Sequence, residues 1–248
     1  MRCRVLLMTI SLILATLTPA AQKHDSASPQ DQVFLTTGVF LYEPGDIHPT
    51  YLDAFKNRPH VVSPDDRLEV TVTGPPESLG AWVTVLQRDN LAGGLDFPVW
   101  PLEGSADVLW RPDSQAFALT DHRYANNMYV LVCGTEFRMG EDGPGLGVPI
   151  TNLTPIVRKA FEQRAAKYYG ADDNYETRLF YAMALRWVGS DDLLLGVSAT
   201  TEGPATFPDH GVNIWAVAYL VDVRNEKLVR EVNKEQLLSE YKIRVNEH

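Results

Sequence analysis

The stretch ADVLWRPDSQAFALTDHRYANNMYVLVCG, residues 106–134, decides how the rest of the chain is interpreted. Its first apolar run ends in Trp110 and leads into a tight turn at residues 111–114 (RPDS). In that turn proline presets φ, while Asp and Ser bond to nearby backbone amides. Apolar strands are expected at 116–120 and 128–133, with a polar loop between them. The stretch therefore predicts an antiparallel β-meander.

Two other segments show the same order of features. The turn at 64–66 (PDD) precedes LEVTV and then a strand that begins near Trp82. The turn at 189–192 (GSDD) precedes LLLGV and then a strand with Trp215 near its start. In this third segment, as at Trp110, the strand before the turn ends in a tryptophan, Trp187. The chain is therefore expected to contain three related β units.

Residues 108–121 (VLWRPDSQAFALTD), followed by 128–132, resemble a repeat of the WD40-like or TolB-like β-propeller type. Residues 184–199 resemble it more loosely, and 64–86 weakly because the leading Trp is absent. The resemblance implies blade-like antiparallel sheets and brings no catalytic residues with it. Closed propellers have about 4–8 blades. A further sheet built with residues 33–42, an open arc, association of copies and a plain two-sheet sandwich are therefore all open.

Other strands are expected around these units. Residues 33–42 (VFLTTGVFLY) and 81–86 (AWVTVL) are rich in β-branched and aromatic side chains. Two prolines in 97–102 (FPVWPL) favour an edge strand, and Trp100 beside them is the tryptophan expected to be exposed. The glycine-rich stretch 140–147 is interpreted as a mobile connector.

The periodicity becomes helical after residue 150. Thr154 is a suitable capping residue, Pro155 suits the first helical position, and Gly170 suits the end. A helical insertion is expected at about 150–178, and a second short helix at 235–241. The predicted fold class is mainly β, with antiparallel blade-like meanders in an incomplete propeller-like or two-sheet arrangement and one helical insertion.

The first 21 residues have the pattern of a secretory signal peptide. Two early arginines precede an apolar run from Val5 to Leu17, and small residues mark the expected cleavage point at Ala20-Ala21. The apolar run is shorter than the about 20 residues of a membrane span. Residues 22–32 are expected to form a flexible leader, and 33–248 a single β-rich domain. The mature protein is therefore expected to be periplasmic or secreted, without a membrane span.

Charge and cysteine content narrow the classes of function. The net charge of −10 disfavours binding to phosphate backbones, so no nucleic-acid partner is expected. Of the two cysteines, Cys3 lies in the signal peptide, which leaves Cys133 and no intrachain disulfide in the mature chain. Cys133 follows three apolar residues and is interpreted as a buried, inert thiol.

Two Asp-His dipeptides are the candidate site. Asp121-His122, with Arg123 beside it, and Asp209-His210 precede the final strands of the second and third units. An Asp–His pair is the combination of a general base and its orienting carboxylate. Adjacent residues rarely point at each other, however, and no serine-elbow motif accompanies them. The favoured interpretation is that both loops contact a ligand or partner on one rim.

The sequence predicts neither a metal site nor a cofactor. The acidic turns at 65–66, 172–174 and 191–192 lack the alternating pattern of a calcium loop. HExxH and CxxC are both absent from the sequence. The leading interpretation is therefore a binding module, leaning away from an enzyme, for another protein or an envelope component. The alternatives are a hydrolase that uses an Asp-His pair, and a structural subunit of an envelope complex. Association of copies into a homo-oligomer is a separate open point.

Overall fold

The computed structural model describes residues 39–42, 60–73, 81–88, 97–102, 105–122, 128–135, 138–140, 143–147, 149–170, 175–203 and 212–245. The expected signal peptide and leader lie outside these residues, as does 33–38 of the first expected strand. Within the described residues, no helix is both long and apolar enough to cross a membrane.

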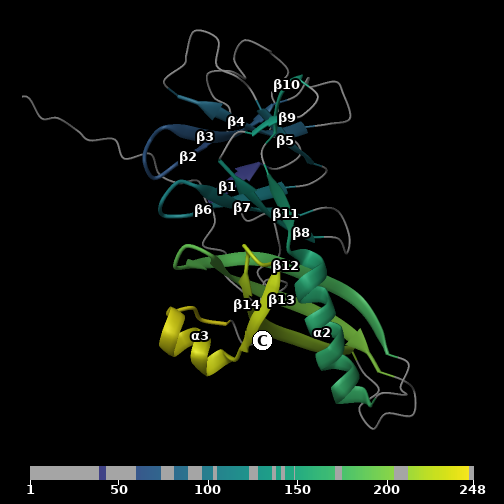
Figure 1. Ribbon diagram of the computed structural model, residues 1–248. Helices are drawn as coiled ribbons and strands as arrows, with labels where there is room; N and C mark the ends of the chain where they lie inside the picture. Colours follow the sequence, from purple (N-terminus) through teal and green to yellow (C-terminus); the bar gives the residue numbers. More distant parts are fainter. Residues whose placement is uncertain are drawn as a thin grey trace, which may run out of the picture.

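The protein is mainly β, with antiparallel sheets stacked one on another (Figure 1). Sheet I has the order β2-β3-β4-β5, with bounds His60–Val62, Leu68–Thr73, Ala81–Gln87 and Phe97–Leu102. Sheet II has the order β1-β6-β7-β8-β11, with bounds Val39–Tyr42, Ser105–Trp110, Ala116–His122, Met128–Gly134 and Ile150–Asn152. Sheet III has the order β12-β13-β14-β15, with bounds Glu176–Val188, Asp192–Glu202, Val212–Asp222 and Lys227–Val232. The hairpin β9-β10 spans Arg138–Gly140 and Gly143–Gly147, and the helices α2 and α3 span Thr154–Tyr169 and Lys234–Tyr241.

Sheets I and II enclose one apolar core. Because side chains alternate along a strand, the residues of β3 that face sheet II are Leu68 and Val70, and both are buried. The opposing side chains of β7 are Phe117 and Leu119, which are fully buried. The indole Nε1 of Trp110, at the end of β6, donates to the carbonyl of Val61, 3.2 Å away. Strand β6 of sheet II and strand β2 of sheet I are therefore joined at this end.

The other face of sheet II packs against α2 and sheet III. Val157, Phe161 and Ala165 of α2 are fully buried, as the apolar helical face predicts. Trp187, at the end of β12, donates from Nε1 to the carbonyl of Leu109 at 3.0 Å. This is the same kind of contact that Trp110 makes with sheet I. The pairing of a terminal tryptophan with the preceding sheet thus recurs along the stack.

The start of α2 differs from the prediction. Thr154 is the first helical residue, and the preceding Leu153 occupies the N-cap position without a side-chain cap. The Thr154 hydroxyl instead accepts a hydrogen bond from Val130 N–H at 2.8 Å. Val130 also accepts from Leu153 N–H at 2.9 Å, so this hydroxyl fastens the helix to β8. The expected end at Gly170 is confirmed, with φ at 93°.

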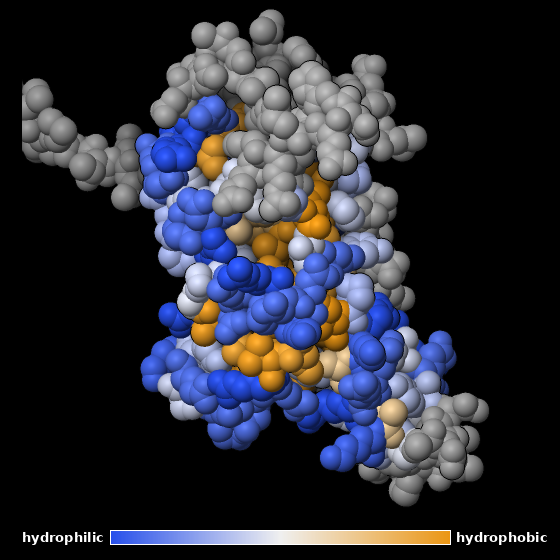
Figure 2. Space-filling model, in the orientation of Figure 1, coloured by the Kyte–Doolittle hydropathy of each residue, from blue (hydrophilic) through white to orange (hydrophobic). Residues whose placement is uncertain are grey.

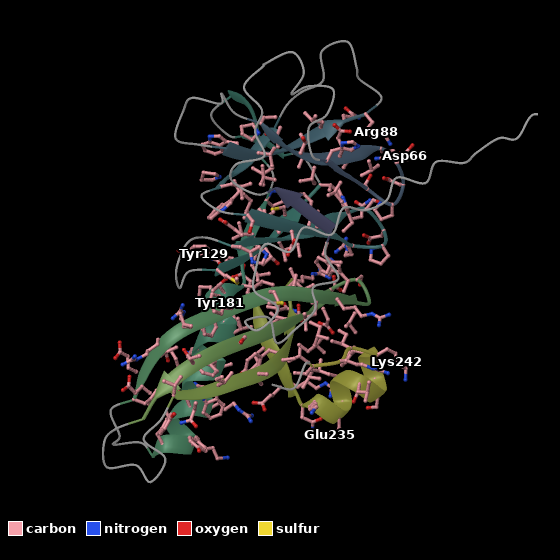
Figure 3. All side chains as sticks on the ribbon, turned by 180° about the vertical axis from the view of Figure 1, so that it is seen from behind. Asp66, Arg88, Tyr129, Tyr181, Glu235 and Lys242 are labelled. Carbon is pink, nitrogen blue, oxygen red and sulfur yellow. The ribbon has the colours of Figure 1, made fainter. Side chains whose placement is uncertain are left out.

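The turns that connect the strands also contact one another. Asp66 and Ser114 each have φ at 62°, the left-handed conformation required at the same point of the two turns. The Asp65 N–H donates to Ser114 Oγ at 3.0 Å, which joins the turns of sheets I and II. Arg88, at the end of β4, forms an ion pair with Asp66 on the surface (Figure 3). The polar turn residues that the sequence predicts therefore also join sheet I to sheet II.

The helix α3 covers part of the face of sheet III that is turned away from sheet II (Figure 1). Leu237, Tyr241 and the following Ile243 are buried there against Leu185 and Leu220. The helix begins with a capping box, in which two residues bond to each other's backbone. Asn233 accepts from Gln236 N–H, and the Gln236 side chain accepts from Asn233 N–H.

Two expectations about individual segments are wrong. The glycine-rich stretch 140–147 contributes to the hairpin β9-β10 and is not simply a connector. Trp100 is half-buried, whereas Trp82 is the exposed tryptophan of sheet I. Trp100 is drawn inward by a hydrogen bond from its indole to a carboxylate of sheet II. The edge position expected for 97–102 is confirmed.

Candidate functional site

Asp121 and His122 are the last two residues of β7, not members of a loop as the sequence suggested. Neighbours in a strand point to opposite faces of the sheet, so they do not form a pair. Asp121 is fully buried and faces sheet I, where its Oδ2 accepts from Trp100 Nε1 at 2.8 Å. Tyr129 lies opposite Asp121 on β8, and its ring centroid is 6.1 Å from that of Trp100. Asp121 therefore joins two sheets.

His122 faces sheet III and pairs with a different carboxylate. Its Nε2 lies 2.8 Å from Oδ2 of Asp107 on β6, and the two side chains are only 17% and 7% exposed. Ser105 lies directly opposite His122 in the antiparallel pairing of β6 and β7. A serine, a histidine and an aspartate thus share one face at this end of sheet II. No described hydrogen bond joins Ser105 to His122.

The remaining predicted site residues are not placed together by the structure. Arg123, Asp209 and His210 lie outside the described residues. In the described part of the chain, no group of three or more His, Cys, Asp or Glu side chains is arranged to hold a metal ion. Cys133 is a buried free thiol, as expected, and burial raises its pKa, which disfavours the reactive thiolate.

A second candidate site is the beginning of β14. Strand β15 pairs with β14 only from Ala218 to Asp222. Among the described strands, none pairs with this side of residues 212–217. Val212 and Ile214 are 56% and 67% exposed, and Ala216 on the same face is also exposed. These three side chains continue the row that α3 covers further along β14, so the apolar face extends beyond its cover.

The opposite face of this segment is held rigidly. Trp215 Nε1 donates to Thr201 Oγ1 at 2.7 Å, and the Tyr169 hydroxyl is 2.7 Å from the same oxygen. Asn213 Nδ2 donates to the Tyr169 hydroxyl at 2.6 Å. Phe161 of α2 meets the Trp215 ring edge-to-face at 5.9 Å between centroids. These contacts hold the backbone of residues 212–217 in an extended conformation. Little conformational entropy would therefore be lost when another strand pairs with this edge.

The segment also lacks the features that protect the other sheet edges. Exposed edges usually carry charges, prolines or very short strands, which prevent pairing with another chain. β1, β2 and β11 are short, β5 has two prolines, and β12 and β15 carry charged residues. Residues 212–217 read VNIWAV, with no charge and no proline. This is the least protected edge in the described part of the chain.

The hydropathy of the surface agrees with an incomplete cover of the core. Figure 2 shows apolar surface in the lower part of the molecule, bordered by hydrophilic surface. The two candidate sites differ in their surroundings: the polar groups at the end of β7 are largely buried and bonded, whereas the side chains of Val212 and Ile214 on β14 are exposed and uncharged.

The chain matches no family model, no curated protein and no solved structure.

Proposed function

We propose that this protein is a non-enzymatic interaction module that binds another protein chain along the free edge of β14. The observation that carries the proposal is the uncharged segment 212–217, one side of which pairs with no described strand, with Val212 and Ile214 more than half exposed. An extended segment of a partner adds to such an edge through backbone hydrogen bonds, and side chains at alternate positions supply specificity. The function is therefore recognition of an uncharged, apolar strand.

The stacked sheets provide the scaffold for this edge. We take the three meanders as blade-like units in an open arc, in keeping with the resemblance of 108–132 to a propeller repeat. The position of α3 supports the open arc, because Leu237 and Tyr241 occupy part of the face on which a further sheet would pack. With the signal peptide expected at residues 1–21, the proposal places the protein in the periplasm or outside the cell.

Site-specific photocrosslinking in the source cells tests the proposal. A benzoylphenylalanine replaces Ile214 in one variant and Leu238 in the control, since both side chains are exposed, on β14 and on α3. We expect a defined crosslinked protein from position 214 and none from position 238. Equal labelling from both positions, or no adduct from position 214, contradicts the proposal. A stoichiometric complex with a different protein that persists through purification would identify the structural-subunit alternative.

A hydrolase is the second candidate, favoured by one specific contact. The 2.8 Å bond between His122 and Asp107 is the geometry of an oriented general base, and Ser105 stands opposite the histidine. A fluorophosphonate probe tests this reading, because it labels a serine that a histidine activates. Labelling of Ser105 in the natural protein that is lost in His122→Ala would establish the hydrolase. Absence of labelling in the natural protein rejects it.

A further inference from the structure

We infer that the strand bound at the β14 edge is β14 of a second copy of this chain, paired antiparallel about a two-fold axis at Ile214. The inference rests on the proposed function, since it names the partner of the same edge. A two-fold axis perpendicular to the sheet brings the same edge of each copy together. The two copies of sheet III would then form one continuous sheet.

The sequence of the edge is self-complementary in this register. Ile214 lies opposite its own copy, and Val212 lies opposite the partner's Ala216. The three exposed side chains of each copy then form a single apolar row on one face. On the other face Asn213 lies opposite the partner's Trp215. Because directly opposed residues share a face in an antiparallel pair, no side chain changes sides.

The neighbouring strand selects this register over the adjacent one. An axis at Trp215 would place Val212 opposite the partner's Ala218. Ala218 already pairs with Val232 of β15, so that position on the edge is occupied. An axis at Ile214 keeps the paired stretch within 212–216, where no described strand of either copy stands in the way.

Charge also favours this edge as the point of self-association. Each chain carries a net charge of −10, so two copies repel wherever their acidic surfaces approach. Residues 212–217 carry no charge, and their pairing opposes no like charges across the axis. The remaining repulsion acts at longer range and is screened over about 8 Å at physiological ionic strength. Added salt should therefore strengthen the dimer, whereas it would weaken a complex held by ion pairs.

Sedimentation equilibrium of the purified protein tests the inference at low and high salt. We expect a monomer–dimer equilibrium that shifts towards dimer as salt is added. Ile214→Lys sets two ammonium groups against each other at the axis and should raise the dissociation constant at least tenfold. Leu238→Lys is the matched control on the exposed side of α3 and should leave it unchanged. A natural protein that stays monomeric, or equal effects of the two lysines, overturns the inference.

Disulfide trapping tests the register, in a Cys3→Ser background with Cys133 buried. Directly opposed residues of an antiparallel pair have Cα atoms about 4.5–5.5 Å apart, within the Cα separations that disulfides span, so Ile214→Cys should crosslink to itself. Val212→Cys alone should not, because its two copies are four residues apart along the strand, or ~13 Å. Val212→Cys mixed with Ala216→Cys should give a crosslinked heterodimer. Efficient self-crosslinking of Val212→Cys contradicts the register.

The two proposals fail in different ways. A monomeric protein that still crosslinks to a different protein from position 214 overturns the second copy as partner and leaves the interaction module in place. A monomeric protein without any adduct at position 214 overturns both. Dimerisation that survives Ile214→Lys shows that copies associate elsewhere, and it likewise overturns the inference.

Discussion

Replacing Phe161 by alanine should weaken the whole stack. Phe161 lies on α2, has no exposed surface, and belongs to a core that includes residues from sheets II and III. Its ring centroid is 5.7 Å from that of Phe180 and 5.9 Å from that of Trp215, both on sheet III. Val130 of sheet II belongs to the same cluster. Truncation therefore opens a cavity where two sheets and a helix meet.

The expected cost follows from the burial of this ring. Removing a fully buried phenylalanine side chain costs about 3–5 kcal/mol, because transfer energy is lost and the cavity closes only in part. That is a large share of the about 5–15 kcal/mol by which natural domains are stable. For a domain of this size, 1 kcal/mol lowers the melting temperature by about 2–4 °C, so a cost of about 3–5 kcal/mol corresponds to a fall of roughly 6–20 °C.

Urea unfolding and hydrogen exchange measure the effect and its extent. The midpoint should fall without a change in the slope m, because the surface exposed on unfolding is the same. Exchange should accelerate in sheets II and III together, since the ring lies between them. Gln163→Ala, at an exposed position on the same helix, should stay within about 0.5 kcal/mol. A loss below about 1.5 kcal/mol, or one confined to sheet III, would refute the idea of a shared core.

Three further predictions concern a thiol, a carboxylate and an indole. Cys133 should react with iodoacetamide roughly 100-fold more slowly in the native protein than in denaturant, and rapid native alkylation would contradict its burial. Partial burial and nearby carboxylates, chiefly Asp222, raise the pKa of Asp192. As the pH rises through this pKa the folded state becomes less stable relative to the unfolded state. Asp192→Asn should therefore stabilise the protein by about 0.5 kcal/mol at pH 7 and not at pH 3, and urea midpoints that shift equally at both would exclude this cause. Trp187→Phe removes the hydrogen bond to Leu109 and should cost about 1–3 kcal/mol in the same assay; an unchanged midpoint would show that the bond contributes nothing.

Elements that are determined by residues close together in the chain are predicted well from the sequence. The turn at 111–114 and its flanking strands are confirmed, because proline and short polar side chains act on the backbone next to them. The edge strand 97–102 is confirmed for a similar reason, since two prolines remove two backbone donors. The apolar face of α2 is buried as its spacing predicts. In each case the cause lies within a few residues of the effect.

The partner of His122 depends on strand register, which adjacent residues do not reveal. The sequence draws attention to Asp121 because it is adjacent, but alternation turns it to the other face. The partner Asp107 lies on the preceding strand, and the turn at 111–114 fixes the register that brings the two together. Counting outward from that turn would have indicated the contact. Arg123, Asp209 and His210 remain predictions.

The free edge at 212–217 escapes sequence reasoning for another reason. Its exposure comes from the shortness of β15, which pairs with only part of β14. Residues IWAVAYLV read as a uniformly apolar strand, so the sequence gives no sign that one end is covered and the other bare. An edge is left unpaired where the neighbouring strand is too short to reach it. It becomes visible only when the strands are placed side by side.

The pairing of β1 with β6 sets the order in which the chain can complete its sheets. Val39 pairs with Val108, although the whole of sheet I lies between them in the sequence. During synthesis sheet I can form from consecutive strands as soon as its last strand emerges. β1 must wait until β6 has been made, so the earliest described strand is among the later ones to find its place. Sheet I is in effect an insertion within sheet II, because its four strands lie in the sequence between β1 and β6.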